Sequence, residues 1–96
     1  VQIIGNEVDE AYLNMIVGLS VSKEAIVRQK DLKIVFSPIH GTGITLVPKL
    51  LEKMGFTNVH IVQRQATPDG NFPTVIYPNP EEKEAMSLGL EQAKGI

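Results

Sequence analysis

One stretch of about 30 residues constrains the fold more than any other part of the sequence. Ile34-Val35-Phe36 is a short, continuous apolar run, which is typical of a strand buried on both faces of a parallel sheet. A loop with two glycines, an amphipathic helix and a second apolar run at residues 59–62 follow it. Strand, helix and strand at this spacing form a βαβ unit, whose strands must run parallel. We therefore predict an α/β fold.

The limits of the helix in this unit are marked by single residues. Pro48 lacks an N–H, so it is tolerated only in the first turn and places the helix start close to Thr45. Gly55 suits the left-handed position that ends a helix, and Phe56 can pack back on Leu51 there.

Two further helices are expected before this unit. Asn6 is a suitable N-cap for the first, and Ser22 for a second at residues 23–29; residues 1–4 read as the tail of a strand. Helical spacing predicts that the first helix buries one apolar face, which consists of Val8, Tyr12, Met15, Ile16 and Leu19.

The region after the βαβ unit begins with a long loop, residues 63–79, that holds three of the six prolines. Residues 74–77 can pair only at a sheet edge. Asn79-Pro80-Glu81-Glu82 predicts a helix start, with a cap followed by proline at the first helical position. This last helix is expected to run to Lys94. Its predicted inward-facing residues are Ala85, Met86, Leu90 and Ala93.

Length and composition limit the class of protein. The chain has 96 residues, which is room for one small domain, and a net charge of -2, which lacks the basic excess of a nucleic-acid-binding protein. Cysteine is absent, which excludes disulfide scaffolds and thiolate metal sites. The chain starts with Val1 and shows no secretion signal, so we expect a processed chain or a piece cut from a longer one.

The loop His40-Gly41-Thr42-Gly43 is the first candidate site, because ligands of parallel α/β sheets bind at the carboxyl ends of strands. Free N–H groups at the start of the following helix suit an anion. The loop lacks a third glycine at Leu46, and an interpretation in which the glycines only permit a tight turn stays equally open. His40 is the better candidate for an acid/base or phosphate contact, whereas His60 lies within a strand.

No catalytic or metal-binding set can be assembled from the remaining residues. Asp9, Asp31 and Asp69 are widely spread, and the glutamates near position 82 open a helix, where acids complement the helix dipole. We therefore predict no metal ligand and no catalytic set among these residues.

The loop Pro68-Asp69-Gly70-Asn71-Phe72-Pro73 is the second candidate site. Proline followed by aspartate and glycine is typical of a turn in which the glycine accepts a positive φ. Phe72 can anchor this turn to the body of the domain. Such a loop is either a structural clamp or a wall of a cleft, and spacing does not decide between the two.

The combination of these motifs resembles the second domain of the α-D-phosphohexomutases, the family of phosphoglucomutase and phosphomannomutase. The resemblance rests on "KIVFSPIHGTG", a helix ending in "KMGF", and "PDGNFPTVIYPNPE", and it covers residues 33–94. It implies a three-layer α/β/α domain with a small, mostly parallel sheet that lacks its last strand or strands. Residues 1–31 are expected to be a helical lead-in from a preceding domain, and residues 32–96 to be domain II, truncated before the metal-binding loop.

The resemblance also implies an activity for the whole enzyme. Such an enzyme is a cytoplasmic, Mg²⁺-dependent isomerase of carbohydrate metabolism that moves a phosphoryl group between O1 and O6 of a hexose. It works through a phosphoserine, with a hexose 1,6-bisphosphate as activator, and its partners are its own neighbouring domains and the hexose phosphate, not nucleic acid or a membrane. The serine and metal loops of the family are absent here, so the chain alone is expected to be inactive.

The residues that match the family's motifs are expected to be structural. They form a signature loop and helix start that consist of Pro68, Asp69, Gly70, Asn71, Phe72, Pro73, Pro78, Asn79, Pro80 and Glu81. An alternative function is a stand-alone α/β module that binds a phosphate-bearing ligand at Gly41-Thr42-Gly43.

Overall fold

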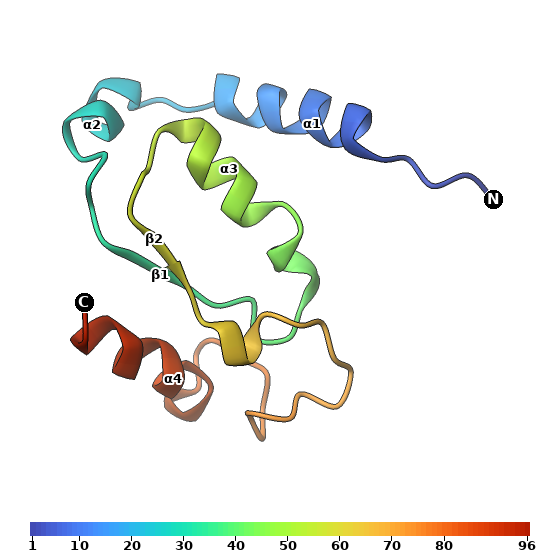
Figure 1. The fold of residues 1–96 in the computed structure, drawn as a ribbon, viewed down its shortest axis with the longest axis vertical. Coiled ribbons are helices and arrows are strands. Elements are labelled where there is room, and N and C mark those ends of the chain that lie inside the picture. The colour runs from blue at the N-terminus through green and yellow to red at the C-terminus, as the bar shows by residue number, and fades with distance from the viewer.

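A computed structural model describes residues 1–96 and shows four α-helices and two strands (Figure 1). In chain order they are α1 (Asn6–Gly18), α2 (Lys23–Arg28), β1 (Ile34–Phe36), α3 (Val47–Met54), β2 (Val59–Ile61) and α4 (Lys83–Lys94). Two short 3₁₀ turns, Thr42–Ile44 and Gln63–Gln65, follow the first and second strand respectively.

The two strands confirm the predicted βαβ unit. They pair in parallel, with Ile34 opposite Val59 and Phe36 opposite Ile61. Figure 1 shows α4 on one side of this pair and α3 on the other, with α1 lying outside α3. The chain is therefore a partial α/β/α domain with a two-stranded parallel sheet.

Helix α3 ends as the sequence predicts. Gly55 has a φ of 107°, in the left-handed region. Its N–H donates to the carbonyl of Glu52, and the N–H of Phe56 donates to the carbonyl of Leu51, which is the Schellman arrangement. The helix begins two residues later than predicted, at Val47, because the 3₁₀ turn comes first; Pro48 still lies in its first turn.

The predicted start of α4 is wrong, and residues 74–77 do not pair with a strand. The side chain of Asn79 accepts a hydrogen bond from the N–H of Glu81 at 3.1 Å, which closes a turn before the helix instead of capping it. The helix begins at Lys83. The N–H of Ile76 donates to the Glu84 carboxylate at 3.1 Å, so this segment bonds to the helix start and not to a strand.

Helix α4 packs against the strands at a buried glycine, where a Cβ would make only ordinary van der Waals contacts. Gly89 is buried, and a Cβ at this position would lie 3.8 Å from Val62 and 3.9 Å from Val35. Ala85 is fully buried as predicted, whereas Leu90 is 58% exposed and does not join the core.

Helix α1 buries a different face from the one predicted. Leu13 is 1% exposed and faces inward, whereas Tyr12 and Met15 are at least half exposed. The N-cap is Gly5, not Asn6, and residues 1–4 are exposed and form no strand.

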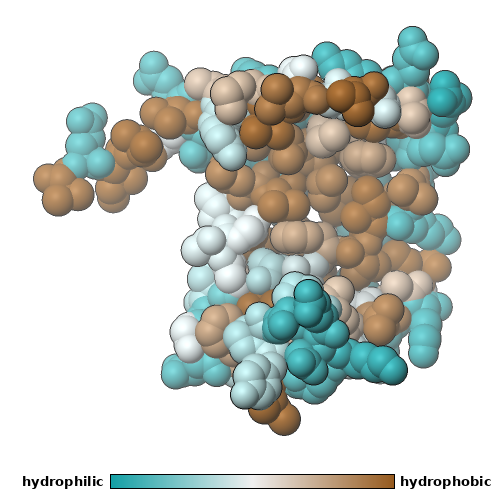
Figure 2. Space-filling model, turned by 180° about the vertical axis from the view of Figure 1, so that it is seen from behind, coloured by the Kyte–Doolittle hydropathy of each residue, from teal (hydrophilic) through white to brown (hydrophobic).

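Much apolar surface stays uncovered. Only seven of 96 residues are buried, and the radius of gyration is 15.0 Å, where about 13 Å is usual for a compact domain of this length. Figure 2 shows hydrophobic residues along the protruding N-terminal arm and over much of the visible face. None of the helices is both long and apolar enough to span a membrane.

Candidate functional site

The candidate site starts with a strained turn directly after β1. The N–H of Gly41 donates to the carbonyl of Pro38 at 2.9 Å, and the two residues between them have positive φ: 47° at Ile39 and 58° at His40. This is the geometry of a type I′ turn, which glycine or asparagine normally occupies, and a β-branched residue in it is unusual. Gly41 is required because a Cβ would lie 2.9 Å from the Pro38 oxygen.

The second predicted loop follows β2 and forms its own turn. The N–H of Phe72 donates to the carbonyl of Asp69 at 3.1 Å, and the N–H of Asn71 donates to the Asp69 carboxylate at 2.9 Å. The positive φ falls on Phe72, at 46°, and not on Gly70 as predicted. The aspartate side chain therefore shapes this turn.

The backbone of His40 joins the two loops. Its N–H donates to the carbonyl of Gln65 at 2.9 Å, and its carbonyl accepts from the N–H of Asp69 at 3.0 Å. Since β1 and β2 are parallel, both loops leave the same edge of the sheet, and these bonds tie them together across it.

The His40 side chain is buried, at 5% exposure, and both ring nitrogens have partners. Nδ1 lies 3.0 Å from the Thr67 carbonyl oxygen, and Nε2 lies 2.9 Å from Thr74 Oγ1. The Phe72 ring meets the imidazole edge-on, with centroids 6.4 Å apart and planes at 80°, so Phe72 anchors its loop as predicted.

Gln65 extends this network into the core, where it is 1% exposed. Ser37 Oγ donates to its Oε1 at 2.6 Å, and its Nε2 donates to Thr74 Oγ1 at 3.1 Å. The same Nε2 lies 3.5 Å from the Ala85 carbonyl in α4. No buried side-chain nitrogen or oxygen in the chain lacks a partner, as expected of a well-formed polar core.

The predicted site residues are therefore partly brought together. His40 lies between the two loops and contacts the PDGNFP loop, whereas Pro78-Asn79-Pro80-Glu81 is exposed and precedes α4. The N–H groups of Thr42 and Gly43 have no acceptor within the chain, which is usual for the first turn of a helix. A phosphate contact by residues 40–43 stays a prediction.

Sequence reasoning missed four polar residues of this network: Ser37, Gln65, Thr67 and Thr74. The available signal was their position. Ser37 directly follows β1, and Gln65 and Thr67 lie shortly after β2, so these three are near the carboxyl edge of the sheet. Thr74 lies farther along the chain, and its position gave no such signal. His60 lies within β2, as predicted, and its Nε2 is 2.7 Å from Asn58 Oδ1.

The chain does not build a metal site from its own side chains. No three His, Asp or Glu residues come together in a group that can hold a metal ion. A Mg²⁺ ion therefore does not fit the residues present here.

Comparison with known proteins now decides the family. The model of "Phosphoglucomutase/phosphomannomutase, alpha/beta/alpha domain II" matches residues 10–95. The chain belongs to this family. The match begins within residues 1–31, and the domain boundary predicted at residue 32 stays a prediction.

Relatives carry names of the same family. A phosphoglucomutase of Staphylococcus haemolyticus is 40% identical over 91% of this chain, and a probable phosphomannomutase of Haemophilus influenzae is 39% identical over 96%. A phosphoglucomutase of Staphylococcus saprophyticus is 36% identical over 97%. The chain spans 15 to 18% of the length of these relatives. No solved structure matches it.

Proposed function

We propose that this chain acts as domain II of a phosphohexomutase that interconverts a hexose 1-phosphate and a hexose 6-phosphate. In this reaction a phosphoserine gives its phosphoryl group to the free hydroxyl of the sugar, and the resulting bisphosphate returns its other phosphoryl group to the serine. The family match over residues 10–95 is the observation that carries the proposal.

The geometry supports a role in shaping the substrate cleft. The loops at residues 40–43 and 68–73 lie at the carboxyl edge of the parallel strands, where α/β proteins bind their ligands. His40 bonds them to each other, and Phe72 packs on its ring. Loops held together this rigidly suit phosphoryl transfer, because that reaction depends on the positioning of charged groups.

The remaining parts of the reaction are assigned to the longer protein. We propose that its other domains supply the serine and the ligands of Mg²⁺, that a hexose 1,6-bisphosphate activates it, and that it is cytoplasmic. The 96-residue chain alone is expected to be inactive, because it holds neither a phosphoserine loop nor a group of metal ligands.

The test is an assay of the intact gene product that carries this chain. Purified protein with Mg²⁺ and a trace of glucose 1,6-bisphosphate should convert glucose 1-phosphate or mannose 1-phosphate to the 6-phosphate. The 96-residue chain, assayed in parallel, should show no turnover. Absence of turnover from the intact protein with both sugars would refute the proposal.

A phosphate-binding module is the competing function, and its test is a titration of the 96-residue chain with inorganic phosphate. The amide signals of Thr42 and Gly43 are the ones to follow by NMR, because their N–H groups have no acceptor within the chain. Saturable binding without mutase activity in the intact protein would favour the module, whereas no binding would favour a scaffold domain.

A further inference from the structure

His40 is the one imidazole enclosed in the polar core, and its surroundings define which ring nitrogen carries the proton. Nδ1 faces the Thr67 carbonyl at 3.0 Å, and a carbonyl oxygen can only accept a hydrogen bond. Nδ1 must therefore donate. In the neutral ring, Nε2 is then an acceptor, and the Thr74 hydroxyl at 2.9 Å must donate to it.

The other end of the network agrees with this assignment. The Gln65 amide faces the Ala85 carbonyl on one side, so its NH₂ group must lie on that side. That NH₂ group donates to Thr74 Oγ1, which leaves the threonine hydroxyl hydrogen free for His40. The amide oxygen faces Ser37 Oγ, which donates to it.

All the hydrogen bonds of the network are therefore consistent with a single direction of donation. Each hydroxyl accepts one bond and donates the next: Ser37 Oγ accepts from the N–H of Ile39 at 3.0 Å before it donates to Gln65. The chain of bonds starts at Ile39 and includes His40, the two residues that hold the unusual positive φ after β1. Strained backbone of this kind persists only where its surroundings fix it.

We propose that His40, with its proton on Nδ1, is a positioning residue that locks the loops after β1 and β2 into one rigid wall of the active-site cleft. It acts through Thr74 and Gln65 and is not a group that reacts with the substrate. The second half of this statement, the active-site cleft, rests on the function proposed above. The lock itself does not depend on that function.

Thr74 provides the sharpest test, because two similar variants separate its hydroxyl from its bulk. Thr74→Val keeps the shape of the side chain but removes the hydroxyl that both accepts from Gln65 and donates to His40. Thr74→Ser keeps the hydroxyl and is the matched control. Both are made in the intact gene product and compared where circular dichroism shows each variant to be folded.

The spectroscopic test reads the proton directly. In the ¹⁵N-histidine spectrum of the wild-type protein, Nδ1 of His40 should give the shift of a protonated nitrogen and Nε2 that of an unprotonated one. A spectrum of His40→Gln, in which this pair of signals is missing, assigns them. A proton found on Nε2 would overturn the proposal.

Amide hydrogen exchange measures how firmly the two loops are held together. In Thr74→Val, the amides of His40 and Asp69, which bond the two loops together, should exchange about tenfold faster or more. In Thr74→Ser, the same amides should exchange at the wild-type rate. Unchanged exchange in Thr74→Val would overturn the lock.

Activity then tests the connection to the cleft. We expect kcat/KM of Thr74→Val to fall about tenfold and that of Thr74→Ser to stay within about threefold of wild type. Normal kcat/KM with loosened loops would remove the positioning role. Absence of turnover in the wild type would refute the proposed function alone, because the proton position and the exchange rates still decide the lock.

Discussion

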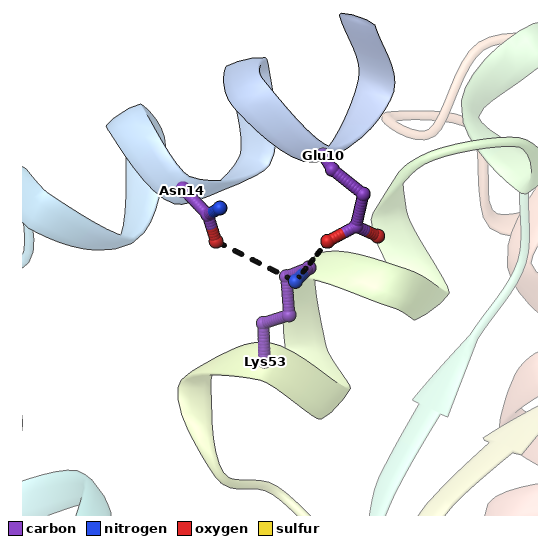
Figure 3. A network of polar contacts seen from close by, with 3 residues as sticks. All are labelled: Glu10, Asn14 and Lys53. Carbon is purple, nitrogen blue, oxygen red and sulfur yellow. Dashed lines mark hydrogen bonds and ion pairs between the residues drawn. The ribbon is translucent and has the colours of Figure 1, made fainter. Parts of the chain in front are cut away.

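The two ends of the molecule are stabilised in different ways. At the carboxyl edge of the sheet, buried polar groups hold the loops, with Gln65 at 1% and His40 at 5% exposure and every buried side-chain nitrogen and oxygen paired. At the opposite side, α1 rests on α3 through a single fully buried residue, Leu13, and one ion pair (Figure 3). Val8, Tyr12 and Met15 on the same helix are 45 to 56% exposed, and Ile16 and Val17 are half-buried.

This difference distinguishes the loops, whose conformation the chain fixes by itself, from helix α1, whose apolar side chains stay partly exposed. A directional hydrogen-bond network fixes a conformation within the chain, since each partner must be in place for the others to be satisfied. An apolar face with little cover is not directional and contributes stability only in proportion to the area removed from water. We therefore expect substitutions at the loops to affect the whole domain, and substitutions in α1 to act locally.

The largest effect is expected from Gln65→Ala. This change opens a cavity in the core and removes a partner from both Ser37 and Thr74. The free energy of unfolding should fall by about 3 kcal/mol, the sum expected for lost packing and unpaired buried groups. Urea denaturation measures it. Gln63→Ala, at an exposed position two residues away, is the control and should cost about 0.5 kcal/mol or less.

Leu13→Ala should come next, at about 2 kcal/mol, near the lower limit for a buried leucine, because the partly open surroundings of α1 can relax. The loss should be local. Hydrogen exchange should speed up in α1, while the amides of His40 and Asp69 keep their protection. Met15→Ala, at a 56% exposed position on the same helix, should change little. Equal loss of protection in both regions would contradict the separation.

Gly41→Ala should cost about 1 to 2 kcal/mol, because its Cβ would lie 2.9 Å from the backbone oxygen of Pro38. Gly70→Ala provides a close comparison, since nothing lies within 4 Å of a Cβ there and its φ is not positive. Thermal denaturation should show a lower Tm for Gly41→Ala and an almost unchanged Tm for Gly70→Ala. The opposite order would mean that the second turn is the more constrained one.

Sequence patterns correctly predicted the elements that neighbouring residues in the chain determine. The strands Ile34–Phe36 and Val59–Ile61 and the end of α3 at Gly55 follow from apolar runs and glycine conformation, which neighbouring residues determine. The start of α4 was wrong because Asn79 closes a turn of its own. The inward face of α1 was wrong because helical spacing gives two adjacent stripes, and packing against α3 selects the one that contains Leu13.

The candidate site was predicted in position but not in composition. The motifs around His40 and Phe72 correctly indicated two special loops, because glycine and proline mark turns. That the two loops bond to each other through Gln65 and Thr74 depends on contacts between residues far apart in the chain. Such contacts leave no spacing pattern in a single sequence. A glutamine that is nearly fully buried is unusual for its residue type, so composition did not point to it either.

The smallest effect is expected at the ion pair that joins α1 to α3. Lys53 pairs with Glu10 and also donates to Asn14 Oδ1 at 3.5 Å (Figure 3), and the two charged side chains are 29% and 54% exposed. Water and salt screen a pair this open, so Glu10→Gln should lower the free energy of unfolding by about 0.5 kcal/mol or less, and the loss should shrink in 1 M NaCl. Glu7→Gln, in the same helix but outside this pair, is the control. If Glu10→Gln released α1 as fully as Leu13→Ala does, the contact between the helices would be electrostatic, and the contrast between a polar end and an apolar end of the molecule would fail.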